Sequence, residues 1–187
     1  RTPDVGIEVL PSDFGYGLDP AKGLAALEQV VASPPDVFAF NLETTRRLFK
    51  EIRPSFDYDR GLQFLAEARA RFGTDTAVKS NIIAGMGETD DEIVQCMRDL
   101  RDAGVQLLTI GQYLQPSAQH LHLDRYVTPE SFARFKQIGE DELGFDHVES
   151  GPMVRSSYHA GDQATDAGAW EASADQPTST RAATSSA

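Results

Sequence analysis

Polar and glycine-rich segments follow four short apolar runs of the chain. They are residues 41–44 (Asn-Leu-Glu-Thr), 85–89 (Gly-Met-Gly-Glu-Thr), 112–116 (Gln-Tyr-Leu-Gln-Pro) and 150–159. Each segment taken alone would serve to cap a helix or make a turn. If the runs are parallel strands, however, their carboxyl ends meet at one rim, where such folds bind ligands. The coincidence favours a binding site built from amides, carboxylates and hydroxyls.

The residues that several other kinds of binding or catalytic site require are missing or poorly placed. Gly85 and Gly87 do not make a phosphate-binding loop, because a third glycine and a Lys-Ser/Thr pair are missing. Cys96 falls within a helical pattern, which indicates a buried structural thiol. His120 and His122 lie in a proline-flanked segment, where solvated side chains are more common than metal ligands. One cysteine cannot supply a disulfide framework, a cysteine zinc site or a full set of cluster thiolates.

The elements that must position the polar segments alternate between strand and helix. Runs rich in β-branched or aromatic residues predict strands at 6–10, 37–40, 78–84, 107–111 and 147–150. Helical spacing with capping residues predicts helices beginning after Asp19 and Thr89 and at Thr128-Pro129, and one ending at Gly73. This order predicts an α/β fold with a parallel sheet covered by helices, either an open doubly wound sheet or part of a barrel. Five strands are too few for an eight-stranded barrel.

Length and charge limit the remaining possibilities. The 187 residues suffice for one core, and the net charge of −12 argues against nucleic acid or anionic membrane as a partner. We expect a soluble, intracellular protein whose folded domain covers residues 1–160. Residues 161–187 lose all periodicity and are expected to form a disordered tail. Since the chain begins with Arg1, we expect it to be the remainder of a longer polypeptide.

The polar segments, taken together, resemble the lipoyl synthases, a family of radical S-adenosylmethionine enzymes. The resemblance rests on residues 41–44, 85–89, 109–116 and 125–130, and on the segment Arg-Ser-Ser-Tyr-His-Ala at 155–160. It covers residues 1–160 and implies a partial TIM-type (β/α)6 barrel of the radical S-adenosylmethionine kind. Members insert two sulfur atoms into an octanoyl chain on a lipoyl carrier domain. They use S-adenosylmethionine and two [4Fe–4S] clusters, of which the auxiliary one is sacrificed as sulfur donor.

The resemblance also implies roles for particular residues. Ser157 would ligate the auxiliary cluster, with Ser156 as the second choice. S-adenosylmethionine would be held by polar residues at the strand ends, namely Asn41, Glu43, Lys79, Ser80, Glu88 and Gln112. The family's G-x-I-x-G-x-x-E motif corresponds to 81–88, with Asn81 in place of the first glycine. Phe40 stands where the family usually has histidine, which predicts the loss of a polar group at the rim.

Three hypotheses follow. The first is the C-terminal part of a lipoyl synthase, inactive alone because the cysteine motifs for both clusters are absent, and dependent as a whole on an electron donor such as ferredoxin or flavodoxin. Its compartment would be the bacterial cytoplasm, a mitochondrion or a plastid. The alternative is a stand-alone, non-catalytic protein that binds S-adenosylmethionine or the carrier on the same scaffold. The third is an unrelated α/β enzyme whose rim acids act as a general acid–base pair.

Overall fold

A five-stranded sheet forms the centre of the molecule. The computed structural model describes residues 5–157, together with 161, 165 and 168. The strands are parallel and lie in the order β1-β2-β3-β4-β5. Their bounds are Glu8–Val9 (β1), Val37–Ala39 (β2), Ala77–Ala84 (β3), Leu107–Gln112 (β4) and His147–Gly151 (β5). All five expected strands are confirmed, with ends that differ by no more than two residues. Apart from residues 161, 165 and 168, the expected tail at 161–187 lies outside the described residues.

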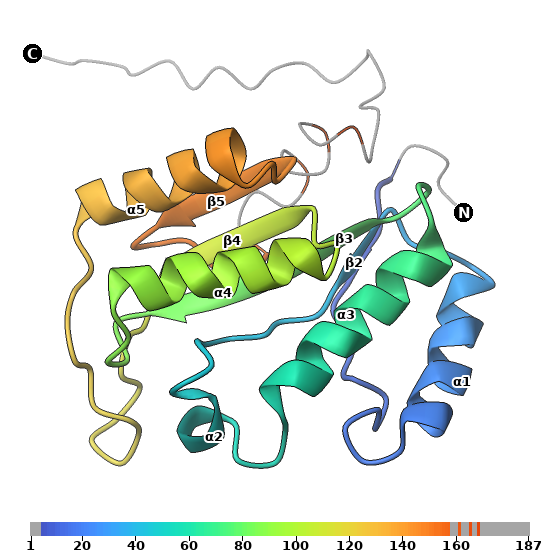
Figure 1. Ribbon diagram of the computed structural model, residues 1–187, viewed down its shortest axis with the longest axis horizontal. Coiled ribbons are helices and arrows are strands. Elements are labelled where there is room, and N and C mark those ends of the chain that lie inside the picture. Colours follow the sequence, from blue (N-terminus) through green and yellow to red (C-terminus); the bar gives the residue numbers. More distant parts are fainter. Residues whose placement is uncertain (1–4, 158–160, 162–164, 166–167, 169–187) are drawn as a thin grey trace, which may run out of the picture.

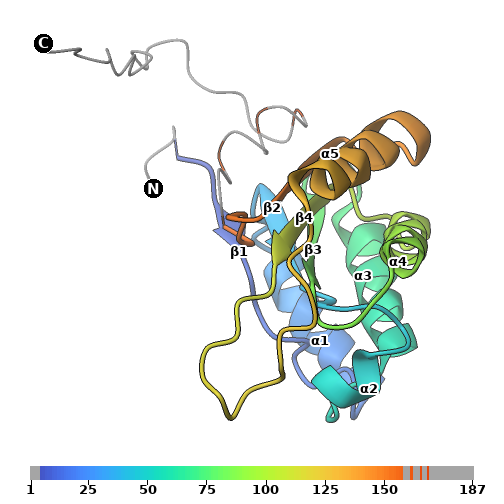
Figure 2. The same ribbon diagram turned by 90° about the vertical axis from the view of Figure 1, so that its left-hand side faces the viewer.

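The strand order decides between the two predicted architectures. Each strand adds to the same growing edge of the sheet, whereas a doubly wound sheet reverses its direction of growth. Figures 1 and 2 show the helices gathered on one side of the sheet. Right-handed crossovers that all proceed in one direction produce this arrangement. The fold is therefore part of an α/β barrel, and the open doubly wound sheet is excluded.

The helices are α1 (Pro20–Val31), α2 (Phe49–Ile52), α3 (Tyr58–Phe72), α4 (Asp90–Asp102) and α5 (Pro129–Gln137), which continues into a π-helical segment at Ile138–Glu142. The helices α1, α4 and α5 begin where their capping residues predict, and α3 ends before Gly73 as expected. The Asp19 and Thr128 side chains accept hydrogen bonds from backbone N–H groups of the first turn. Thr89 and Glu92 form a reciprocal capping box. The four-residue α2 is not predicted, because it is too short for periodicity to reveal it.

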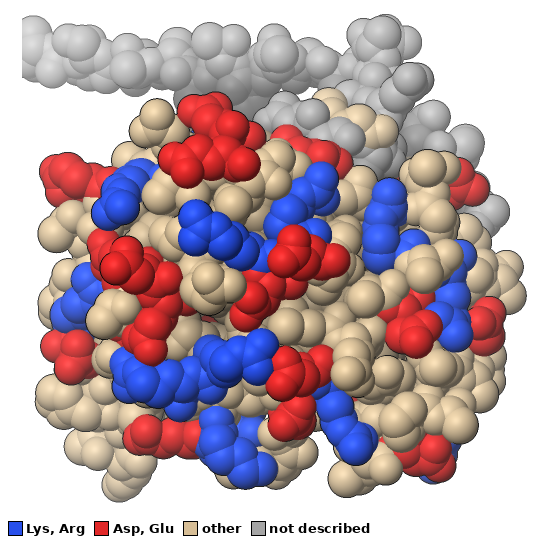
Figure 3. Space-filling view, viewed as in Figure 1, with Lys and Arg blue, Asp and Glu red and all other residues tan. Residues whose placement is uncertain are grey.

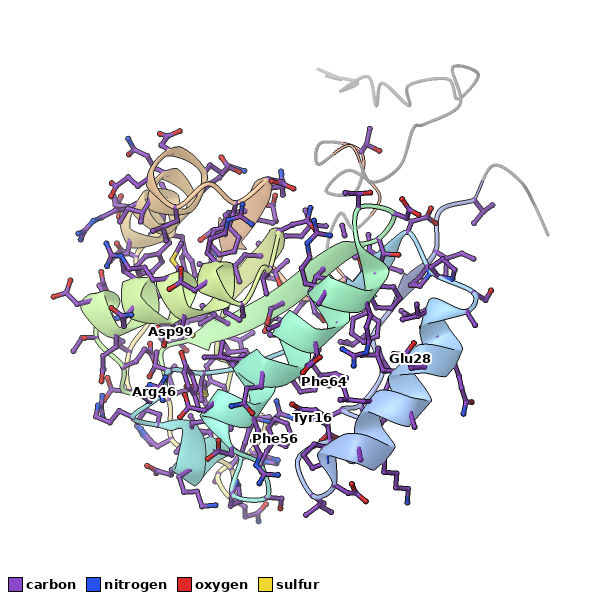
Figure 4. All side chains as sticks on the ribbon, turned by 45° about the vertical axis from the view of Figure 1, so that its right-hand side comes forward. Tyr16, Glu28, Arg46, Phe56, Phe64 and Asp99 are labelled. Atoms are coloured by element: carbon purple, nitrogen blue, oxygen red, sulfur yellow. The ribbon has the colours of Figure 1, made fainter. Side chains whose placement is uncertain are left out.

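The main core fills the space between the sheet and the helices. Phe64 of α3 is fully buried and contacts the rings of Tyr16, Phe38 and Phe40, with centroid distances of 5.0–6.2 Å. Figure 4 shows Tyr16 and Phe64 together between α1 and α3. The Phe40 ring is therefore part of this core and is 4% exposed. The expectation that Phe40 removes a polar group from the rim is wrong, since its side chain points toward the helices.

The opposite face of the sheet carries polar side chains among apolar ones such as Ala39 and Leu107. Successive side chains of a strand point to opposite faces of the sheet. The residues that alternate with the core residues along each strand therefore point away from the helices. Asn81 of β3 is paired in register with Thr109 of β4, which is paired with Glu149 of β5. Lys79 forms an ion pair with Glu8 of β1 at 3.0 Å. Polar side chains on the inner face suit a barrel interior that binds a ligand, because a packed apolar core would leave them unsatisfied.

The outer surface of the helices is solvated. Figure 3 shows Lys and Arg side chains interspersed with Asp and Glu over the helical face. Within the described part of the chain, every helix is too short or too polar to cross a bilayer. Unlike charges that alternate over a surface need no partner molecule to explain them. The search for function therefore moves to the polar face and to the strand ends.

Replacing Phe64 by Ala should lower the free energy of unfolding by about 3–5 kcal/mol, because the change leaves a cavity among four aromatic rings. Urea denaturation followed by circular dichroism measures this loss. The matched control is Leu18→Ala, whose side chain is 89% exposed and should change stability by less than about 0.5 kcal/mol. Equal effects of the two substitutions would contradict the described core.

Candidate active site

A cavity of about 340 Å³, lined by both polar and apolar side chains, opens at the carboxyl ends of β2, β3 and β4. It is lined by Asn41, Glu43, Asn81, Ile83, Gly111, Gln112, Tyr113, Leu114, Val154, Arg155 and Ser156. Of the residues expected to bind a cofactor, Asn41, Glu43 and Gln112 are thus brought together. Lys79, Ser80 and Glu88 are not in the lining, and Ser156 lines the cavity in place of Ser157.

Glu43 is the acidic residue of this cavity, and its backbone is strained. Its φ of 79° lies in the left-handed region, which a residue with a long side chain rarely adopts. Two hydrogen bonds to β3 hold it there: its N–H donates to the Asn81 carbonyl at 3.0 Å, and its carbonyl accepts from the Ile83 N–H at 2.8 Å. Burial raises the pKa of the Glu43 carboxyl, and Arg53 and a hydrogen bond with Asn41 partly offset that rise. Strain and desolvation of this kind accumulate at functional sites.

Arg53 supports this corner of the cavity, and no sequence pattern indicates this role. Its Nη1 donates to the Asn41 carbonyl at 2.7 Å. Its guanidinium lies over the rings of Phe40, Phe49 and Phe56, at 5.2–5.9 Å from their centroids. Arg53 terminates α2, the helix that periodicity could not reveal. Cation–π contacts of this type fix a cation beside the backbone of residues 41–43.

Glu88 shapes the glycine turn and does not reach the cavity. Its buried carboxylate accepts hydrogen bonds from the N–H groups of Gly85 at 2.6 Å and Met86 at 3.0 Å. Gly85 has a φ of 104°, and a Cβ there would lie 2.5 Å from the Arg125 carbonyl. The turn therefore needs glycine at 85 and an acceptor at 88. This accounts for the glycine and glutamate of the motif without any contact between Glu88 and a ligand.

The Gln112 amide anchors the segment 113–127. Its Nε2 donates to the carbonyls of Ala84, Tyr113 and Arg125 at 3.0–3.2 Å, and its Oε1 accepts from the Val127 N–H at 2.8 Å. These bonds occupy both polar atoms of the amide. Gln112 therefore holds the cavity wall in place.

Lys79 and Ser80 lie below the cavity, toward the start of β3. Lys79 is 1% exposed, and its Nζ donates to both carboxylate oxygens of Glu8 at 3.0 and 3.2 Å. Ser80 Oγ donates to the Phe40 carbonyl and accepts from the Leu42 N–H. Lys79 therefore closes the floor beneath Asn81, while Ser80 ties the end of β2 to β3.

The segment after β5 covers the opposite side of the cavity. A Cβ on Gly111 would lie 2.3 Å from the Val154 carbonyl oxygen, so this segment crosses β4 in direct contact with its backbone. Arg155 and Ser156 follow and line the cavity. Ser157 is exposed, and the rest of the motif, residues 158–160, lies outside the described residues.

The described residues do not form a metal centre by themselves. Among them, no group of three or more His, Cys, Asp and Glu side chains is arranged to hold a metal ion. Burial raises the pKa of the Cys96 thiol to about 12, and the thiol contacts the Thr44 carbonyl within the core. His120 and His122 are exposed, as expected. An iron–sulfur cluster at Ser157 would need further ligands from outside this part of the chain.

The fold and the cavity together define a protein of the α/β-barrel type, with a cavity lined in part by polar side chains at the carboxyl ends of its strands. The chain is 52% identical over 169 residues to the lipoyl synthase of Thiobacillus denitrificans, which covers 90% of this chain and 52% of that protein. For the lipoyl synthase of Nitrosospira multiformis the identity is 51%, with 90% and 51% covered. For that of Rubrobacter xylanophilus it is 47%, with 89% and 50% covered. No family model matches the chain.

The resemblance to lipoyl synthases expected from the motifs is confirmed over nine-tenths of the chain. The chain spans about half the length of the curated relatives it matches. Because these relatives all carry the name of an enzyme, the alternative of a non-catalytic binding protein is not favoured.

Replacing Gly111 by Ala should displace the segment 154–156 from β4, because the added methyl group would lie 2.3 Å from a backbone oxygen. Faster hydrogen exchange at the Val154 amide, which donates to the Gly151 carbonyl, measures the displacement. The matched control is Gly151→Ala in the next strand, where the nearest atom lies 3.4 Å away. Unchanged exchange in the Gly111 variant would contradict the described packing.

Replacing Glu43 by Gln should stabilise the fold at neutral pH. The raised pKa means that the folded state favours the protonated form of this carboxyl. As pH rises above the pKa of an unfolded glutamate, about 4.3, the ionised carboxyl therefore lowers the stability of the folded state. The stability difference between Glu43→Gln and the original protein should therefore be larger at pH 7 than at pH 4. Urea titrations at the two pH values measure it, and an equal difference at both would contradict the raised pKa.

Proposed function

We propose that this chain is the C-terminal part of a lipoyl synthase, which inserts two sulfur atoms into a protein-bound octanoyl chain by radical S-adenosylmethionine chemistry. The observation that carries the proposal is the identity of about one half to lipoyl synthases across nine-tenths of the chain. The activity is assigned to the complete protein. The 187-residue chain alone is proposed to be inactive, because it lacks the cysteine motifs of both clusters.

The cavity is proposed to hold S-adenosylmethionine. Asn41 and Glu43 offer an amide and a carboxylate that suit hydroxyl or amino groups of a polar ligand. Gln112, Glu88, Ser80 and Lys79 act through the walls and the floor, as their hydrogen bonds indicate. When bound, S-adenosylmethionine and the two [4Fe–4S] clusters would supply the electron, the hydrogen-abstracting radical and the sulfur.

The rim of the cavity is suited to the second substrate. Leu114 lines the cavity, and its side chain is 46% exposed. An exposed apolar side chain at a cavity mouth favours an alkyl chain such as octanoyl. We therefore place an octanoylated carrier domain at this rim. A small electron-transfer protein, ferredoxin or flavodoxin, and a cytoplasmic location complete the proposal.

Ser157 is proposed as the ligand of the auxiliary cluster. Its hydroxyl is exposed at the end of the segment that covers the cavity, so it can be approached from outside this part of the chain. A serine oxygen binds iron less firmly than a thiolate does, which suits a cluster that is dismantled during the reaction.

The native protein, meaning the complete protein of which this chain is proposed to be the C-terminal part, should convert an octanoylated carrier into the lipoyl form. It would be reconstituted with iron and sulfide and given S-adenosylmethionine and a reductant. Mass spectrometry of the carrier measures sulfur insertion, and chromatography measures 5′-deoxyadenosine. Ser157→Ala should lower sulfur insertion by about tenfold or more while 5′-deoxyadenosine still forms. Ser156→Ala is the matched control.

Different results would overturn different parts of the proposal. If the reconstituted native protein forms no lipoyl group, the proposed function is wrong. If Ser156→Ala, and not Ser157→Ala, abolishes sulfur insertion, the ligand is Ser156. If the auxiliary cluster remains complete and lipoyl formation is unchanged in Ser157→Ala, the ligand assignment is wrong.

A further inference from the structure

Asn81 occupies the floor of the cavity, between β3 and β4. It is 4% exposed, and its Nδ2 donates to Thr109 Oγ1 at 2.8 Å and to the Thr109 carbonyl at 3.4 Å. Thr109 is its register partner on the neighbouring strand, so both ends of this contact are fixed by the sheet. The Asn81 amide is therefore held in one orientation.

The oxygen of that amide has no donor among the residues that the structure describes. Because its nitrogen is bound to Thr109, its Oδ1 is on the side away from β4, and Asn81 belongs to the cavity lining. Among the described residues, the buried side-chain oxygens without a hydrogen bond are the hydroxyls of Thr44 and Thr45, so Asn81 Oδ1 is open to the cavity that Asn81 lines. An accessible amide oxygen held in one orientation at a cavity wall can accept a hydrogen bond from a ligand.

The neighbours of Asn81 indicate which ligand group it accepts from. Asn41 and Glu43 line the same cavity from the adjoining strand end, and the Glu43 N–H donates to the Asn81 carbonyl. A carboxylate is the group with which dinucleotide-binding proteins hold a ribose hydroxyl. The Lys79–Glu8 ion pair lies beneath and prevents a ligand from going deeper.

We propose that Asn81 Oδ1 accepts a hydrogen bond from a ribose hydroxyl of a nucleoside ligand, and that Thr109 positions the amide for this contact. The inference rests on the proposed function, in which the nucleoside is the adenosyl part of S-adenosylmethionine. The motif that this segment resembles has glycine at the position of Asn81 and can make no such bond. Asn81 is thus a binding residue that this chain adds to the cavity.

The test measures binding of 5′-deoxyadenosine to the native protein by calorimetry. Asn81→Ala and Asn81→Gly should each weaken binding by about 2–10-fold, which is the value of one hydrogen bond. The analogue that lacks the contacted hydroxyl, either 2′,5′-dideoxyadenosine or 3′,5′-dideoxyadenosine, should bind the original and variant proteins equally. The other analogue should still be affected, which identifies the hydroxyl.

A second pair of variants tests the positioning role. Thr109→Val removes the acceptor of the Asn81 amide at constant shape, and it should also weaken 5′-deoxyadenosine binding. Thr76→Val is the matched control, because Thr76 is a buried threonine whose hydroxyl donates to the Pro35 carbonyl at the other end of β3. It should leave binding unchanged.

The outcomes separate this inference from the proposed function. If the original protein binds neither S-adenosylmethionine nor 5′-deoxyadenosine, the proposed function fails and the inference fails with it. If the original protein binds both and the Asn81 variants bind 5′-deoxyadenosine equally well, only the role of Asn81 is wrong. Equal losses for 5′-deoxyadenosine and both analogues would also overturn it, since the effect would then not depend on a hydroxyl.

Discussion

Parallel pairing of consecutive strands is the constraint on which the rest of this structure depends. Each strand must be reached by a crossover, and crossovers of one hand that proceed in one direction place all their helices on one face. That face acquires the apolar core around Phe64 and Leu100. The other face is left without helices, so Asn81 and Thr109 can remain polar there. The cavity is a consequence of this division, because every strand delivers its carboxyl end to the same rim.

Close approach of backbone segments at this rim gives the cavity its shape. Gly85 and Gly111 allow two loops to contact the strand ends at distances that a Cβ would forbid. Glu43 adopts a left-handed conformation between two hydrogen bonds to β3. Packing of the core offsets the unfavourable backbone conformations at the rim, as is usual where a site presents groups in conformations that are otherwise rare.

The sequence predicted the elements better than the roles of individual side chains. The five strands and the capped helices carry local signals, namely alternation, spacing and capping residues such as Thr89. The roles of Glu88 and Gln112 depend on which backbone groups surround them after folding, and no local pattern contains that information. Arg53 was missed for the same reason, since its partners come from the residues after β2, from the start of α2 and from the segment after α2. The cavity lies at the rim that the sequence predicted. That prediction used the rule that parallel α/β folds bind ligands at the carboxyl ends of their strands, which depends on topology and not on individual contacts.

Hydrogen-bonding groups and apolar groups lie at different depths of the cavity. Asn81 lies within β3, and Glu43 is fixed against the same strand, so hydrogen-bonding groups occupy the floor. Tyr113 and Leu114 come after the end of β4 and belong to the mouth. A polar ligand would bond to the groups of the floor, whereas an alkyl chain placed there would cover them without bonding to them. The floor of the cavity therefore suits a polar ligand, and the mouth suits an apolar group.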